Sequence, residues 1–101
     1  MELNQKNNIT KYLKANITLF NSFENVYLFG SILCRENIPN DIDLLLIYSA
    51  YSKKILDDLN YIESTLSLVF NLPVDLTVLS IEEEKNTRFL LKINSSYLKL
   101  K

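Results

Sequence analysis

The sequence contains no histidine, and it contains a single cysteine, Cys34. Zinc sites built from cysteine and histidine are therefore excluded, as are all catalytic arrangements that use an imidazole as the base. One cysteine cannot form a disulfide within the chain. The chemistry of this protein must depend on carboxylates, hydroxyls, backbone groups and a few basic side chains.

Long apolar runs and a basic stripe are also missing. The longest apolar stretches, such as "LLLIY" at 44–48, are far too short to span a bilayer, and the first residues, "MELNQKNNIT", are too polar for a signal peptide. The 11 cationic residues are scattered and the formal net charge is −1, which leaves no surface suited to the phosphates of a long nucleic acid. These absences predict a cytoplasmic protein that binds neither membranes nor DNA or RNA.

Apolar spacing predicts helices in a single domain that spans residues 1–101. Apolar residues at intervals of three and four indicate amphipathic helices over 5–20 and 52–71. Ser80 and Glu83 match a capping box, which predicts a last helix that ends near residue 93. No repeat or linker interrupts the chain.

Short β-branched and aromatic runs predict the strands. They lie at 26–29, 41–49 and 73–80, and the continuous apolar middle of the second run indicates a strand that is covered on both faces. The segment at 31–37 is expected to form a short helix. The alternating tail at 96–100 favours a final strand, with a continuing helix as the alternative.

Three aspartates are expected to meet at one edge of the sheet. Asp41 and Asp43 are two residues apart on one strand and therefore point to the same face. Only ten residues separate Gly30 from Asp41, too few for a parallel crossover, so the first two strands are expected to be antiparallel. The long helix that follows fits a parallel crossover. Asp75, near the start of the third strand, then lies beside the other two aspartates if it points to their face and the strands are close neighbours.

Three carboxylates at one place repel one another unless cations neutralise them. Mg²⁺ prefers oxygen ligands and is commonly held by carboxylates together with substrate phosphates. Two such ions, about 3.5–4 Å apart, activate an attacking hydroxyl and stabilise a leaving pyrophosphate. Next to the aspartates, Gly30 and Ser31 offer backbone N–H groups and a hydroxyl to a phosphate. The sequence therefore predicts a site for magnesium and a phosphorylated substrate.

The motifs "LFGS", "DIDLLL" nine residues later and "PVDLTVL" after the helix resemble the polymerase-β-type nucleotidyltransferase superfamily. The small size and the closing "FLLKINSSYLKL" are most similar to the minimal nucleotidyltransferases that pair with HEPN-domain toxins in toxin–antitoxin modules. The resemblance implies an α/β (α+β) fold with a small mixed sheet packed with helices, in the order α-β-α-β-α-β-α and then an optional strand.

The resemblance also implies a role for each residue of the motifs. Gly30 and Ser31 would hold the triphosphate of ATP, and Asp41 and Asp43 would bind two Mg²⁺ ions. Asp75 would bind the catalytic ion and help to activate the acceptor hydroxyl. The implied reaction transfers AMP to a tyrosine of a partner HEPN toxin in a hetero-oligomer and releases pyrophosphate.

One segment departs from the pattern of the family. Many minimal members read Gly-Ser-Arg-x-Arg-Gly, whereas three residues, "ILC", stand here between Ser31 and Arg35. We assign Arg35 to the phosphate site as the replacement, with Arg88 on the last helix as the alternative. The missing arginines also support a different function, in which a catalytically weakened domain neutralises its partner by binding alone.

Two further enzyme classes share the motif and fit the sequence less well. Antibiotic nucleotidyltransferases normally need an added domain that binds the acceptor. Polymerases and tRNA-end-adding enzymes need a nucleic-acid surface that the charge distribution does not supply. The sequence specifies neither the base of the donor nucleotide nor the acceptor residue.

Overall fold

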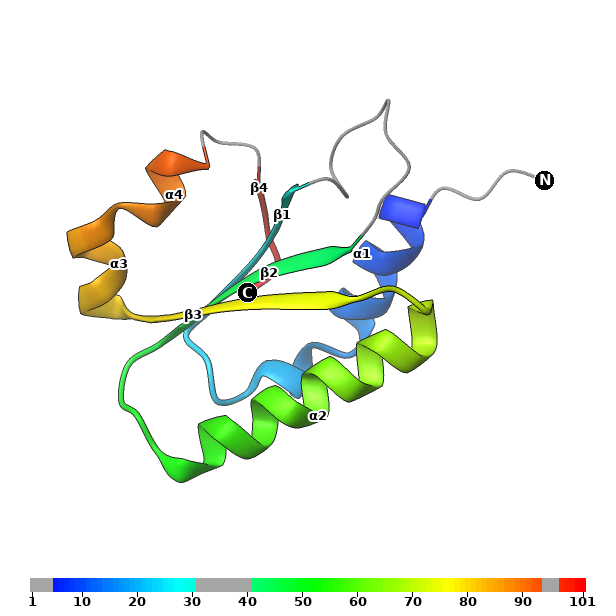
Figure 1. Ribbon diagram of the computed structural model, residues 1–101, viewed down its shortest axis with the longest axis horizontal. Coiled ribbons are helices and arrows are strands. Elements are labelled where there is room, and N and C mark those ends of the chain that lie inside the picture. Colours follow the sequence, from blue (N-terminus) through cyan, green and yellow to red (C-terminus); the bar gives the residue numbers. More distant parts are fainter. Residues whose placement is uncertain (1–4, 31–40, 94–96) are drawn as a thin grey trace.

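A computed structural model describes residues 5–30, 41–93 and 97–101 (Figure 1). The helices and strands, in chain order, are α1 (Gln5–Ala15), the 3₁₀ helix η1 (Ile17–Phe20), β1 (Asn25–Phe29), β2 (Ile42–Tyr48), α2 (Lys53–Phe70), β3 (Val74–Ser80), α3 (Ile81–Thr87), α4 (Phe89–Lys92) and β4 (Tyr97–Lys99). The short helix expected at 31–37 lies outside the described residues. The order of the other elements agrees with the expected order, except that the first and last helices are each divided in two, and the tail forms the expected strand.

The four strands form one mixed sheet in the order β3-β2-β1-β4. β1 runs antiparallel to β2, and β3 runs parallel to β2 after the crossover through α2. β4 pairs antiparallel with β1 on its other side. Both strand directions predicted from the lengths of the connections are confirmed.

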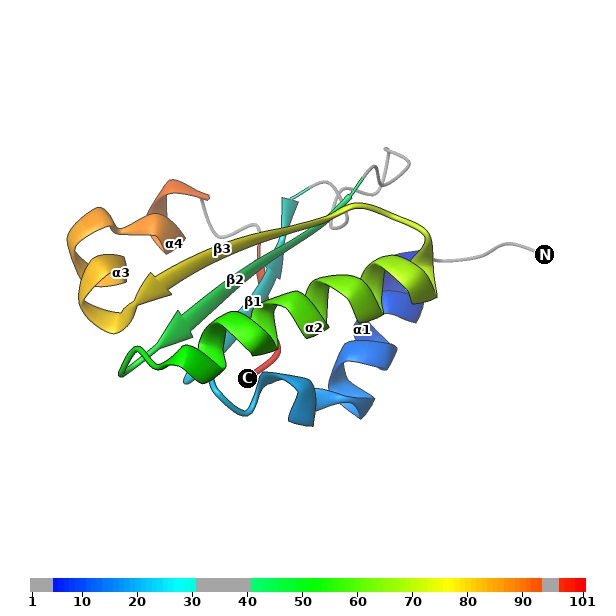
Figure 2. The same ribbon diagram turned by 60° about the horizontal axis from the view of Figure 1, so that its bottom comes forward.

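Helices cover both faces of the sheet. α1 and α2 lie along one face (Figure 2), where the larger core buries alternate residues of β2, Leu44 and Leu46. The intervening residues, Leu45 and Ile47, form a smaller cluster with Tyr27 on the other face. The prediction that the second strand is covered on both faces is therefore confirmed.

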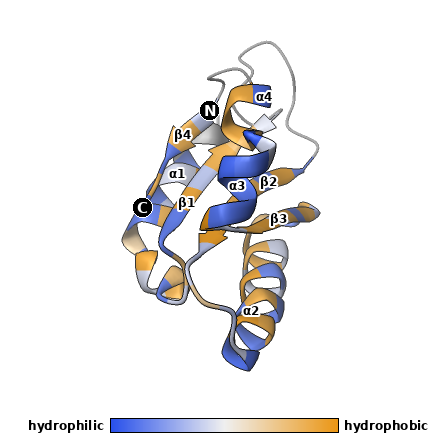
Figure 3. Cartoon of the chain, turned by 90° about the vertical axis from the view of Figure 1, so that its left-hand side faces the viewer, coloured by the Kyte–Doolittle hydropathy of each residue, from blue (hydrophilic) through white to orange (hydrophobic). Residues whose placement is uncertain are grey.

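The last helix is broken at Arg88, which corrects the expected continuous helix over 80–93. Arg88 has φ 53° and separates α3 from α4. α3 buries none of its side chains, whereas Phe89 and Leu90 of α4 pack against the cluster around Tyr27. Figure 3 shows the contrast, with a mostly hydrophilic α3 next to a mostly hydrophobic α4. The break turns the apolar residues of α4 onto the sheet.

The first helix is also interrupted, at Asn16, so the expected single helix over 5–20 is wrong. Asn16 has φ −113° and ψ 37°, and its side-chain amide donates to the carbonyl of Tyr12 over 2.9 Å. This local hydrogen bond competes with the continuing helix. The chain then resumes as η1, whose Phe20 is fully buried.

Helix capping agrees with the sequence at the start of α3. The Ser80 hydroxyl accepts from the N–H of Glu83 over 2.9 Å, and the Glu83 carboxylate accepts from the N–H of Ser80 over 2.8 Å. This reciprocal pair is the predicted capping box. At the other end of β3, Asn71 ends α2 in a left-handed conformation with φ 54°, and its N–H donates to the carbonyl of Ser67.

A polar contact joins α2 to the turn after η1. The Ser22 hydroxyl donates to the Asp58 carboxylate, and the Lys54 ammonium lies 3.2 Å from the same carboxylate. The hydrogen bond from Ser22 is the main cause that lowers the pKa of Asp58, and Lys54 lowers it further.

Within the described residues, no helix has the length and apolar character needed to cross a membrane.

Candidate functional site

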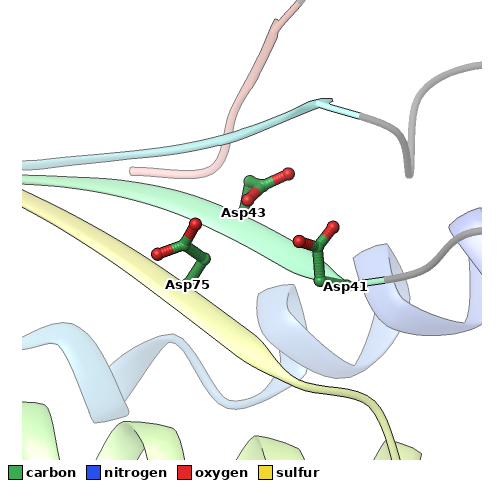
Figure 4. A group of neighbouring side chains, drawn as sticks. All are labelled: Asp41, Asp43 and Asp75. Atoms are coloured by element: carbon green, nitrogen blue, oxygen red, sulfur yellow. The ribbon is translucent and has the colours of Figure 1, made fainter.

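Three aspartates meet on one face of the sheet, as the sequence predicts. Asp41 directly precedes β2, Asp43 lies on β2, and Asp75 is the residue of β3 that pairs with Asp43. Figure 4 shows the three carboxylates gathered on the same side of the two strands. One oxygen from each residue lies within 4.8 Å of the others. The parallel register between β2 and β3 therefore creates an acidic cluster.

The cluster perturbs the ionisation of its central member. The pKa of Asp43 is raised from 3.8 to about 6, first because burial disfavours the charged carboxylate. The negative charges of Asp41 and Asp75 and a hydrogen bond with the Asp41 side chain raise the pKa further. A cation bound nearby would therefore favour the charged form of the Asp43 carboxylate.

The donor set fits a hard divalent cation. All three side chains supply oxygen, the ligand atom that Mg²⁺ prefers. Asp41 and Asp43 are half-buried, and Asp75 is exposed. The cluster is thus open on the side of β3. A cation held there would compensate the mutual repulsion that raises the pKa of Asp43.

Gly30 lies against the same carboxylate. It follows Phe29, the residue of β1 that pairs with Asp43, and has φ +86°. A Cβ built at position 30 would overlap Oδ2 of Asp43 and would lie 3.0 Å from Cγ and 3.2 Å from Cβ of that residue. The chain's only glycine therefore makes room for a residue of the acidic cluster. Sequence reasoning assigned Gly30 to phosphate and missed this contact, although the single glycine was the signal.

Of the other residues assigned to phosphate, the described part of the chain includes only Arg88. Ser31 and Arg35 lie outside the described residues. Arg88 is exposed between α3 and α4, and among the described side chains it makes no ion pair with the aspartates. Their roles at the phosphate remain predictions.

The polymerase β nucleotidyltransferase family matches residues 7–98. The chain belongs to this family. No curated protein matches the nucleotidyltransferase significantly.

Solved structures resemble the whole fold of the nucleotidyltransferase. A toxin–antitoxin structure with AMP-PNP is 23% identical, with a TM-score of 0.58, over 95% of this chain and 72% of that chain. A MntA–HpeT toxin–antitoxin variant with two aspartates changed to glutamates is 21% identical, with a TM-score of 0.58 and the same coverage. A putative nucleotidyltransferase from Sulfolobus solfataricus is 22% identical, with a TM-score of 0.50, over 94% of this chain and 78% of that chain. At these identities the likeness concerns the fold.

Proposed function

We propose that this nucleotidyltransferase transfers AMP from ATP to a hydroxyl of a partner protein and acts in this way as an antitoxin. The observation that carries the proposal is the meeting of Asp41, Asp43 and Asp75 on adjacent parallel strands. Membership of the family supports nucleotidyl transfer. The toxin–antitoxin structures of the same fold, one of them with AMP-PNP, support the nucleotide and the biological role.

In the proposed reaction, the acceptor oxygen forms a bond to the α-phosphorus of ATP. The bond from that phosphorus to the oxygen shared with the β-phosphate breaks, and pyrophosphate leaves with the electron pair. The proton of the hydroxyl passes to Asp75, the exposed carboxylate at the open side of the cluster. Asp41 and Asp43 would hold two Mg²⁺ ions together with Asp75. The bound cations would neutralise the charge on the attacking and leaving oxygens.

The partner we propose is a HEPN-domain toxin, and the acceptor is one of its tyrosines. The toxin–antitoxin structures of the same fold support this choice of partner. A complex of the two chains would place the hydroxyl at the exposed side of Asp75. Gly30 and Ser31, with Arg35, would hold the triphosphate.

Transfer of label from ATP tests this function. With α-labelled ATP, Mg²⁺ and the toxin, we expect the wild-type chain to label the toxin. The Asp41→Ala/Asp43→Ala variant is expected to lose the activity by at least about a thousandfold, because two of the three proposed metal ligands are gone. A matched control, Asp57→Ala/Glu63→Ala, removes two exposed carboxylates from α2 and is expected to retain full activity. Equal labelling by the first variant and the wild type would refute the function.

A second candidate function is neutralisation by binding alone. The observation that favours it is the absence of arginines directly after Ser31. Under this function, Asp41→Ala/Asp43→Ala protects cells from the toxin as well as the wild type does, and no ATP is consumed. Loss of protection in that variant, with its fold intact, argues for catalysis.

A further inference from the structure

β3 forms an open edge of the sheet. All seven residues of β3 pair with β2 in an unbroken register, and no strand of the described chain pairs with its other side. Proteins usually protect such an edge with a lysine, a proline or a bulge. The sequence of β3, "VDLTVLS", contains no lysine or proline, and its one charged residue is Asp75 of the acidic cluster. Its outer side is a template for another strand.

The hydrogen bonds identify the groups on the outer side of β3. The N–H of Ile42 donates to the carbonyl of Pro73 over 2.9 Å, so alternate residues from 73 onward face β2. The backbone groups of Val74, Leu76 and Val78 therefore face away from β2. Ser80 belongs to the same outward set, and its N–H is already bonded to Glu83 in the capping box. The open ladder thus ends where α3 begins.

The open edge is continuous with the acidic cluster. Asp75 lies on β3 and is exposed. A strand added to the outer side would lie about 4.8 Å away, with the Cβ of the residue opposite Asp75 at about 4.5–5.5 Å. That residue would point to the face that carries the cluster. An added strand therefore delivers one side chain directly to Asp75.

Charge favours a cationic occupant. Residues 41–93, which include β3, α2 and α3, carry nine acidic and five basic side chains. A second copy that paired antiparallel along β3 would bring its α3 glutamates, Glu82 and Glu83, toward Asp75. This like-charge contact disfavours self-pairing. A basic segment of another protein meets no such repulsion.

We propose that the outer edge of β3 binds an extended cationic segment of the partner protein as a fifth strand, and that this segment carries the acceptor hydroxyl. The second part of this inference rests on the proposed function. The backbone of Val74, Leu76 and Val78 supplies the hydrogen bonds. The alternation of side chains along the segment selects the residue that reaches Asp75.

Residue-resolved amide exchange tests the docking in the absence of ATP and Mg²⁺. The probe is the peptide acetyl-Lys-Thr-Val-Tyr-Val-Thr-Lys-amide at millimolar concentration. In the free chain, we expect the amides of Leu76 and Val78 to exchange at least about a hundredfold faster than those of Thr77 and Leu79. The peptide is expected to slow Leu76 and Val78 by at least about tenfold. Absence of this slowing overturns the proposal.

Two peptide controls separate strand pairing from other binding. One carries N-methyl groups on alternate amides, which blocks pairing and keeps the side chains. The other has glutamates in place of the lysines. We expect neither to slow the exchange of Leu76 or Val78. Equal slowing by either control overturns the proposed mode of binding.

A matched pair of variants tests the edge from the other side. Val78→Pro and Val78→Ala both remove the branched valine side chain, but only proline removes the outward N–H. We expect peptide affinity to fall at least about tenfold more in Val78→Pro than in Val78→Ala. Equal affinities overturn the proposal. If Val78→Pro does not fold, the N-methylated peptide still tests whether binding depends on backbone hydrogen bonds.

Addition of α-labelled ATP and Mg²⁺ to the same sample separates the two proposals. If the peptide protects the amides of Leu76 and Val78 but its tyrosine receives no AMP, β3 still binds an added strand. This result would contradict the inference that the added strand carries the acceptor hydroxyl. In that case, the assay with the toxin still tests nucleotidyl transfer. Transfer to the tyrosine without protection overturns the docking edge and retains the proposed function.

Discussion

Gly30, directly after β1, is in contact with Asp43 of β2. A Cβ at position 30 would lie 3.0 Å from Cγ of Asp43 and would overlap its Oδ2. Gly30 also has φ +86°, a conformation that L-residues rarely adopt. This pair links the backbone at the end of β1 to the placement of a carboxylate in the acidic cluster.

We predict that Gly30→Ala displaces the Asp43 carboxylate and weakens Mn²⁺ binding by about tenfold, as does the loss of a supporting contact at other metal sites. The strained backbone is also expected to lower the free energy of unfolding by about 1–2 kcal/mol. Calorimetric titration with Mn²⁺ and urea unfolding measure the two effects.

Asn71→Ala is the matched control for backbone strain. Asn71 also has a positive φ, 54°, but it ends α2 and contributes no ligand to the cluster. We expect a loss of stability of about 1 kcal/mol and unchanged Mn²⁺ affinity. If Gly30→Ala binds Mn²⁺ as well as Asn71→Ala does, Gly30 does not position Asp43.

The raised pKa of Asp43 predicts an unusual dependence of stability on pH. The pKa is about 6 in the folded chain and 3.8 as the reference for the unfolded chain, so the folded chain binds more protons between these values. The contribution of Asp43 to the free energy of unfolding therefore falls as the pH rises from about 4 to about 6. Urea unfolding in metal-free buffer measures this contribution as the difference in the free energy of unfolding between the wild type and Asp43→Asn.

Mg²⁺ is predicted to reverse this trend. A cation stabilises the charged carboxylates, so the free energy of unfolding with saturating Mg²⁺ is expected to rise over the same interval of pH. Identical pH profiles for the wild type and Asp43→Asn, with and without Mg²⁺, would show that Asp43 is not perturbed by the cluster.

The contact between Ser22 and Asp58 is predicted to stabilise the packing of α2 on the turn after η1. Ser22→Ala is expected to lower the free energy of unfolding by about 1 kcal/mol at pH 7. Because the folded pKa of Asp58 is lowered, its contribution is present above the unfolded pKa and is lost as the pH falls through the folded value. The free energies of unfolding of the wild type and Ser22→Ala are thus expected to become equal in acid. A difference that is the same at pH 7 and pH 2 contradicts this account.

The break at Arg88 predicts a stabilising substitution. Glycine adopts the observed φ of 53° without the strain that a side chain imposes, so Arg88→Gly is expected to raise the free energy of unfolding by about 0.5–1 kcal/mol. Arg88→Val is expected to lower it, because a branched side chain resists this conformation. Thermal unfolding compares the two, and destabilisation by glycine would contradict the account. Reduced ATP affinity in Arg88→Gly would support the alternative phosphate role of Arg88.

The sequence predicts the strand directions and the acidic cluster because they depend on the lengths of the connections. Ten residues after Gly30 exclude a parallel crossover, and the helix after β2 permits one. These two facts put the start of β3 at the same edge of the sheet as Asp41 and Asp43, and Asp75 lies beside Asp43 because β2 and β3 are also neighbours in register. The boundary between α3 and α4 is different, since "NTRFLL" contains no glycine or proline to mark a break. The break follows from packing of Phe89 onto the sheet, which is a tertiary effect.

The contact between Gly30 and Asp43 also lies beyond sequence reasoning. It depends on the register that pairs Phe29 with Asp43, and a shift by one residue would turn Asp43 to the other face. The connection between the strands constrains their direction but not this register. The single glycine identifies an important position, and only the structure identifies its neighbour.

A calorimetric titration of ATP into the protein in the presence of Mg²⁺ tests whether the acidic cluster is the metal and nucleotide site. We predict that Asp41→Asn/Asp43→Asn weakens Mg²⁺-dependent ATP binding by at least about a hundredfold, because the variant keeps the shape of the site and loses two charged ligands. Equal ATP affinity of this variant and the wild type would contradict the assignment of the acidic cluster as the metal and nucleotide site.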